Sequence, residues 1–184
     1  TLNKLIESKE LNVANIYSLI ESINASLEIL HKNYIVHRDL KPSNILVKSK
    51  IPFEFALADF GISSILEEGF SRKFTKKQGT ELYWAPEASA GDIRRESDYF
   101  SLGATILEAL LGKHPLAGLN EQLIISTMRT KGLVVPEGID NNLKTLIKGL
   151  LTRDPEKRWG YSEVSRWLKG DKNIPVYSDN QVES

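Results

Sequence analysis

The stretch from His37 to Asn44 constrains this chain more than any other feature of its sequence. It reads His-Arg-Asp-Leu-Lys-Pro-Ser-Asn and lies between two short apolar runs, residues 34–36 and 45–47, which favour extended backbone. Three further short sequences follow it in order: Asp59-Phe60-Gly61, Ala85-Pro86-Glu87, and Asp98 to Gly103. A lone Asp, Asn or Lys in a loop is usually a turn former or a solvated charge. The ordered set is hard to explain by chance and indicates one functional site.

The composition limits the classes of protein to which this chain can belong. The chain has 184 residues, of which 41% are hydrophobic and 26% charged, which is typical of one soluble domain with a sizeable core. Lys plus Arg and Asp plus Glu both number 24, so the net charge of zero argues against a nucleic-acid partner. There are no cysteines, which excludes disulfides and thiolate metal sites and fits a cytoplasmic location.

No segment predicts a membrane span or a secretory signal. The best candidate for a span, residues 100–111, is too short and contains Glu108, so a buried core helix is the better interpretation. The chain starts at Thr1 and not at Met, so we expect it to begin partway through a longer protein.

Hydrophobic spacing predicts an α+β fold that is mainly α. We expect helices at residues 2–9, 12–33, 97–111, 119–130, 140–152 and 161–169. Asn12 is the expected cap of the second helix. A hairpin is expected over 45–57 with its connection at 48–52, followed by a long polar loop over 61–83. Residues 1–170 form the predicted domain, and 171–184 a polar tail or linker.

The sequence from His37 to Asn44 resembles the catalytic loop of protein kinases, H-R-D-x-x-x-x-N. With Asp-Phe-Gly and Ala-Pro-Glu after it, the chain resembles the large C-terminal lobe of a eukaryotic-like (Hanks-type) protein kinase, from Thr1 to about Gly170. The resemblance implies a helical bundle with short β-hairpins at the catalytic cleft.

The resemblance also implies roles for individual residues. Asp39 matches the catalytic aspartate near the substrate hydroxyl, and Asn44 and Asp59 match the ligands of Mg²⁺, which prefers hard oxygen atoms. Leu46 matches the residue beneath the adenine of ATP. The order strand, loop, strand places Asn44 and Asp59 at neighbouring strand ends, where they can share one site.

Two residues indicate the serine/threonine class and a protein substrate. Lys41 matches a lysine that contacts the transferring phosphate of ATP in serine/threonine kinases. Thr80 matches a threonine that bonds the catalytic aspartate and this lysine. Kinase-like folds that act on small molecules are an alternative, but Lys41 and the segment 79–87 favour protein substrates.

Other matches are structural or regulatory. Glu87 is expected to form a buried ion pair with Arg158, and Asp98 to cap the backbone of the catalytic loop. His37 and Phe60 match a stacked column of side chains, and plain core packing is an alternative that is compatible with this role.

The arginine before the catalytic aspartate suggests control by phosphorylation. Arg38 would pair with a phosphate on the loop over 59–87, with Thr75 as the first candidate phosphosite and Ser71 as the second. The basic residues at 72, 73, 76 and 77 would attract acidic substrates, or they form a solvated charge run.

The sequence contains no G-x-G-x-x-G and no lysine in a Val-Ala-Ile-Lys context, which belong to the small lobe of such kinases. The missing small lobe of the same parent chain is therefore an expected partner, and we expect residues 1–184 alone not to turn over ATP. The alternative function is a truncated or pseudokinase-like binding scaffold. Intact Asp39, Asn44 and Asp59 argue against degeneration.

Overall fold

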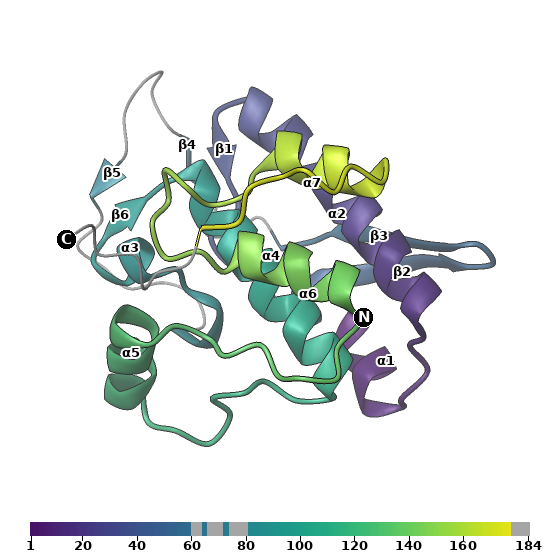
Figure 1. Cartoon of the computed structure of the whole chain (residues 1–184), viewed down its shortest axis with the longest axis horizontal. Helices are drawn as coiled ribbons and strands as arrows, with labels where there is room; N and C mark the ends of the chain where they lie inside the picture. Colours follow the sequence, from purple (N-terminus) through teal and green to yellow (C-terminus); the bar gives the residue numbers. More distant parts are fainter. Residues whose placement is uncertain (60–63, 66–71, 74–80, 178–184) are drawn as a thin grey trace.

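The computed structural model describes residues 1–59, 64–65, 72–73 and 81–177, and they form a mainly helical structure with short antiparallel strand pairs (Figure 1). The helices are α1 (Leu2–Glu7), α2 (Val13–Lys32), α3 (Pro86–Ser89), α4 (Arg95–Leu111), α5 (Glu121–Thr130), α6 (Asn141–Leu150) and α7 (Tyr161–Leu168). The strands are β1 (Ile35–Val36), β2 (Ile45–Lys50), β3 (Phe53–Leu57), β4 (Ser64–Ile65), β5 (Arg72–Lys73) and β6 (Asp92–Ile93). β1 pairs with β4, β2 with β3, and β5 with β6.

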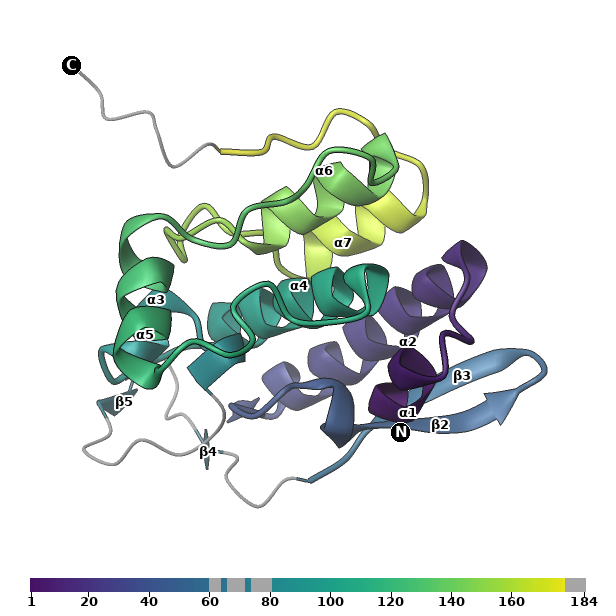
Figure 2. The same cartoon turned by 90° about the horizontal axis from the view of Figure 1, so that it is seen from below.

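Helix α4 lies at the centre of the helices (Figures 1 and 2), in contact with α2 and with α6. Residues 97–107 of α4 are all buried, as expected of a helix covered on every side. The sequence-based interpretation of residues 100–111 as a core helix is therefore confirmed in its main part. Within the described residues, no helix is long and apolar enough to cross a membrane.

The local sequence of α2 predicts a helix and its start. Its buried side chains include Ile16, Ile20 and Leu27, which recur at helical spacing and face the core. The Asn12 side chain accepts the N–H of Asn15 at 2.9 Å, and the Asn15 side chain accepts the N–H of Asn12 at 3.0 Å. This reciprocal cap satisfies donors that a helix start leaves unpaired, and it confirms the predicted start.

The predicted hairpin is present as β2 and β3, with Ile45 opposite Leu57. Strand β3 has the expected bounds, but β2 is longer than expected, because it continues to Lys50 through an irregularity between Val47 and Ser49. Residues 48–50, expected in the connection, therefore belong to a strand. Helix α2 packs on β3, which fixes the hairpin against the helical core.

Some elements escaped the sequence-based prediction. Helix α3 and strand β6 were not expected, because a four-residue helix and a two-residue strand are too short to show a hydrophobic period. The expected tail is also packed in its first part. Ile174 is only 6% exposed and belongs to the main core, so folded structure continues beyond Gly170.

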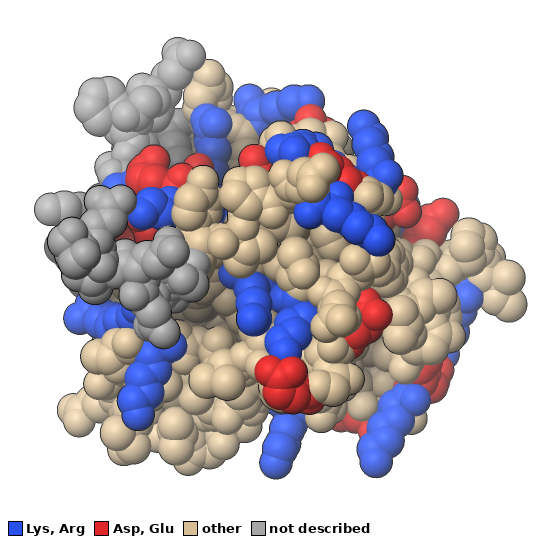
Figure 3. Space-filling model, viewed as in Figure 1, with Lys and Arg blue, Asp and Glu red and all other residues tan. Residues whose placement is uncertain are grey.

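Basic and acidic side chains are interspersed over the face of the molecule seen in Figure 3. The mixture means that this face carries no broad field of one sign, in keeping with equal numbers of acidic and basic residues in the sequence.

Candidate functional site

Asp98, near the start of α4, binds the backbone of the loop from His37 to Asn44. One carboxylate oxygen, Oδ2, accepts the backbone N–H of His37, and the other, Oδ1, accepts that of Arg38, both at 2.9 Å. Asp98 is fully buried, and Arg38 has a φ of 72°, a conformation that is unfavourable for residues other than glycine. The predicted cap is thus present, and it holds a backbone that would otherwise relax.

His31 joins this arrangement from the last turn of α2. Its Nε2 lies 2.8 Å from Oδ2 of Asp98, and its ring meets the Tyr99 ring edge to face at 5.6 Å. The sequence-based reasoning missed this residue. The available signal was a histidine on the buried stripe of α2, where a polar side chain needs a hydrogen-bonding partner.

The side chains of Asp39, Lys41 and Asn44 meet within one turn. Asn44 Nδ2 donates to the backbone oxygen of Asp39 at 2.8 Å and to its Oδ2 at 2.9 Å. Lys41 Nζ lies 2.7 Å from the same Oδ2. A short 3₁₀ helix, η1 (Pro42–Asn44), turns the chain back so that Asn44 reaches Asp39. The Asp39 carboxylate is therefore oriented by an amide and an ammonium group.

Asp59 lies two residues after the end of β3, which pairs with the strand that follows this loop. The backbone N–H of Ala58 donates to the oxygen of Asn44 at 2.8 Å, which extends the β2–β3 ladder by one step. His37 Nε2 lies 3.0 Å from the oxygen of Ala58. Asp59 itself is exposed and has a φ of 62°. The hairpin therefore brings the backbones of Asn44 and Asp59 to neighbouring strand ends, as expected.

Asp59 and Asn44 are the candidate metal ligands at this end of the hairpin. Among the described residues, no group of three or more His, Cys, Asp or Glu could hold a metal ion. Mg²⁺, however, keeps several waters and takes only one or two carboxylates together with phosphate oxygens. One exposed carboxylate, Asp59, beside one amide, Asn44, fits magnesium held together with a phosphate ligand.

Glu87 and Arg158 form the ion pair expected from the sequence. Arg158 donates to Oε1 of Glu87 at 2.6 Å and to Oε2 at 2.9 Å, and its side chain has no exposed surface. The same guanidinium donates to the backbone oxygens of Thr152, Glu96 and Arg153. The start of α3 is thereby fixed to the start of α4 and to the loop before α7.

Tyr83 is a further residue that the sequence-based reasoning missed. Its hydroxyl donates to Oε2 of Glu108 at 2.6 Å, and its backbone oxygen accepts the hydroxyl of Ser101 at 2.7 Å. Burial, together with the bond to Glu108, raises the pKa of Tyr83. His114 meets the same ring edge to face at 5.2 Å, and burial lowers the pKa of His114 to about 4. Segment 81–85 is therefore fixed to α4 by the hydrogen bonds of Tyr83 to Glu108 and Ser101.

Leu46 lies on β2 with 44% of its surface exposed, next to the loop that holds Asn44. This exposed apolar side chain lies two residues after Asn44 in the chain. Phe60, Ser71, Thr75 and Thr80, which the sequence singled out, lie outside the described residues.

Comparison with known proteins agrees with this geometry. Residues 1–167 match the family described as protein kinase domain. The chain is 36% identical over 175 residues to a calcium and calcium/calmodulin-dependent serine/threonine-protein kinase of Lotus japonicus, covering 91% of this chain and 33% of that protein. It is 30% identical over 156 residues to the serine/threonine-protein kinase GRIK1 of Arabidopsis thaliana, covering 83% and 39%.

A third relative is the carbon catabolite-derepressing protein kinase of Secale cereale, 29% identical over 178 residues, with 96% of this chain and 35% of that protein covered. The chain thus spans roughly a third of the length of these relatives.

Proposed function

Because this chain belongs to the protein kinase domain family, we propose that it supplies the large lobe of an ATP- and magnesium-dependent serine/threonine protein kinase. The observation that carries the proposal is the carboxylate of Asp39, oriented by Asn44 and Lys41 in a loop whose end pairs with the strand leading to Asp59. The similarity to serine/threonine-protein kinases supports serine and threonine hydroxyls as the phosphate acceptors.

Each residue of the site has a role in the proposed reaction. The oxygen of a substrate serine or threonine attacks the γ-phosphorus of ATP, the bond to the β-phosphate oxygen breaks, and ADP leaves. Asp39 orients the hydroxyl and accepts its proton, while the ammonium of Lys41 offsets charge on the transferring phosphoryl group. Asn44 and Asp59 would hold magnesium, which when bound neutralises phosphate charge. Leu46 would contact the adenine.

Regulation by phosphorylation is part of the proposal. Arg38 is held by its backbone N–H on Asp98, and burial lowers the pKa of its guanidinium while the charge of Asp98 raises it. Arginine remains cationic at neutral pH under such opposing effects. A phosphate on Thr75, or on Ser71, is the proposed partner of Arg38, and Thr80 the proposed partner of Asp39 and Lys41.

The decisive test uses a protein that contains this chain together with a small lobe. Transfer of labelled phosphate from ATP and Mg²⁺ to a protein substrate is measured for the parent and for Asp39→Asn. We expect Asp39→Asn to abolish transfer, whereas Asp154→Asn, the same change at an exposed site, leaves it near normal. Near-normal turnover of Asp39→Asn would overturn the proposed function.

We also propose that residues 1–184 alone do not turn over ATP at a useful rate, since their sequence lacks the Gly-rich loop and strand lysine that grip the phosphates. Robust phosphotransfer by this chain alone, lost on Asp39→Ala, would contradict that. A binding scaffold is the alternative. It requires a parent protein that binds its partners normally but shows no phosphotransfer. A cytoplasmic location remains a prediction from composition.

A further inference from the structure

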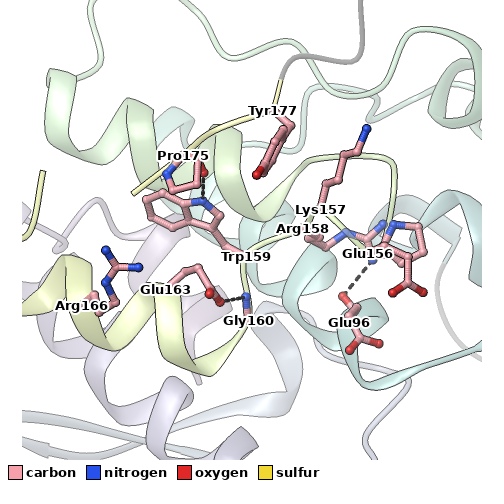
Figure 4. Close-up of a pocket in the computed structure, with 11 residues that line it drawn as sticks. Glu96, Glu156, Lys157, Arg158, Trp159, Gly160, Glu163, Arg166, Pro175 and Tyr177 are labelled. Atoms are coloured by element: carbon pink, nitrogen blue, oxygen red, sulfur yellow. Dashed lines mark hydrogen bonds between the residues drawn. The ribbon is translucent and has the colours of Figure 1, made fainter. Parts of the chain in front are cut away.

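The chain after the last helix folds back onto the protein, and we call residues 171–177 the strap. Ile174 of the strap is buried in the main core. The indole Nε1 of Trp159 donates to the backbone oxygen of Pro175 at 2.8 Å, as Figure 4 shows. Near its end, the ammonium of Lys157 lies 5.8 Å from the centre of the Tyr177 ring. The strap is thus attached at separate points along its length.

Trp159 is enclosed between the strap and helix α6. It is 1% exposed, and its backbone N–H donates to the oxygen of Gly149 in α6 at 3.0 Å. A Cβ placed on Gly149 would lie 2.3 Å from the indole ring, so the ring already touches the helix backbone. The indole therefore cannot move toward α6, and the strap limits its movement on the other side.

The residue before Trp159 is Arg158, which holds Glu87. A displacement of Trp159 acts directly on the peptide that carries the Arg158 side chain. Arg158 donates to both carboxylate oxygens of Glu87, so its position sets where α3 begins relative to α4. It also donates to the backbone oxygen of Glu96, as Figure 4 shows. A continuous series of contacts runs from Pro175 through Trp159 and Arg158 to Glu87.

The strap also covers a cavity of about 390 Å³. Pro175 and Tyr177 form one wall of it, and Glu96, Lys157 and Arg158 contribute to the others.

We propose that the strap is a positioning element, which holds Trp159 and Arg158 so that Glu87 and helix α3 keep their place. The strap is then coupled to α3 through these contacts. The consequence for substrate binding rests on the proposed function, because it assumes that the segment before α3 receives the substrate. The coupling itself does not depend on that function and is tested without phosphotransfer.

The test compares hydrogen exchange in the chain with Ile174→Asp against Val176→Asp. Both place a carboxylate on the strap, but Ile174 is buried and Val176 is 36% exposed, so only the first should release the strap. The reporters are the amides of Ser89, Ala90 and Gly91, which donate to backbone oxygens of residues 85, 87 and 88. We expect at least tenfold faster exchange there in Ile174→Asp, with α2 amides unchanged, and no change in Val176→Asp.

Because coupling acts in both directions, a second experiment changes Glu87 and measures exchange at Trp159. Glu87→Gln should speed exchange of the Trp159 indole N–H, which the strap otherwise protects, by a larger factor than exchange of the α2 amides. Exchange that rises equally in α2 and α3 would mean general destabilisation and would overturn the proposal. Faster exchange of the Trp159 indole N–H in Ile174→Asp, with unchanged exchange of the α3 amides, would also overturn the proposal. Should Ile174→Asp fail to fold, Ile174→Ala carries the same comparison with Val176→Ala.

Discussion

The carboxylate of Asp98 accepts the backbone N–H of His37 at 2.9 Å, although the two residues are 61 positions apart in the chain. The same group accepts Arg38 N–H and lies 2.8 Å from His31. One buried side chain in α4 therefore joins the end of α2 to the start of the loop that carries Asp39. The shape of the candidate site depends on the helical core beneath it.

Replacing Asp98 by alanine should therefore destabilise the protein strongly. The change removes the acceptor of the His37 N–H, which is fully buried, and of the Arg38 N–H, which is partly buried, and each buried unsatisfied group costs about 1–3 kcal/mol. We expect a loss of about 3–5 kcal/mol in the free energy of unfolding, measured by urea denaturation. Asp98→Asn keeps one acceptor oxygen and should lose less. Equal losses in the two variants would contradict this account.

The ion pair of Glu87 and Arg158 should show strong coupling in a double-mutant cycle. Glu87→Gln leaves the guanidinium, which has no exposed surface, without its charged partner, so a loss of about 3–5 kcal/mol is expected. Arg158→Met also destabilises, but the double variant should lose about 2 kcal/mol less than the sum of the single losses. Additive losses would show that the two side chains do not stabilise each other.

Gly149→Ala should destabilise the protein although alanine is the better helix former. The gain from helix propensity is about 1 kcal/mol. Against it stands the new Cβ, 2.3 Å from the ring of Trp159, and overpacking of this kind costs about 1–3 kcal/mol. We expect a lower melting temperature for Gly149→Ala and little change for Lys148→Ala, at the exposed neighbouring position. A raised melting temperature for Gly149→Ala would mean that Trp159 moves aside freely.

Buried His114 should make the protein less stable in mild acid. Its pKa is lowered to about 4 by burial, against about 6.5 in the unfolded chain, so the unfolded state binds the proton first as pH falls. This contribution to stability is present above pH 6.5 and is lost as pH falls toward 4.

Between pH 7 and pH 5 the loss due to His114 should be about 2 kcal/mol in the free energy of unfolding. The measurement is denaturation at both pH values for the parent and for His114→Gln. Between pH 7 and pH 5, the free energy of unfolding should fall by about 2 kcal/mol less in His114→Gln than in the parent, because glutamine cannot take up the proton. An identical pH dependence in both proteins would exclude His114 as the source.

Asp59→Asn should remove phosphotransfer without unfolding the protein. Its side chain is exposed, so the loss of charge should leave the melting temperature nearly unchanged. In a protein that carries both lobes, we expect transfer to fall by about 10²–10³-fold or more, because the proposed magnesium ligand is lost. The melting temperature serves as the internal control. Near-normal turnover would remove the metal assignment.

Local sequence predicted the parts of the fold that depend on near neighbours. The apolar stripe of α2 and its cap at Asn12 follow from residues within a few positions of each other. The contact between Asn44 and Asp39 also lies within one turn. The place of Asp59 beside Asn44 followed from one hairpin, since antiparallel pairing fixes which strand ends meet.

The contacts of Glu87 with Arg158 and of Asp98 with the loop were expected only because the chain resembles a known family. Neither follows from spacing, since the partners lie far apart in the chain. His31, Tyr83 and the strap were missed altogether. Nothing in the local pattern states that His31 faces Asp98 or that Tyr83 reaches Glu108.

The sequence by itself determined the helices with a clear apolar period, the hairpin, and the meeting of Asp39, Lys41 and Asn44, because these depend on interactions over a few residues. The tertiary structure alone decided which buried polar groups pair, and that the strap returns to Trp159. The physical reason is that a buried donor or acceptor must find a partner, but which partner it finds depends on how the helices pack.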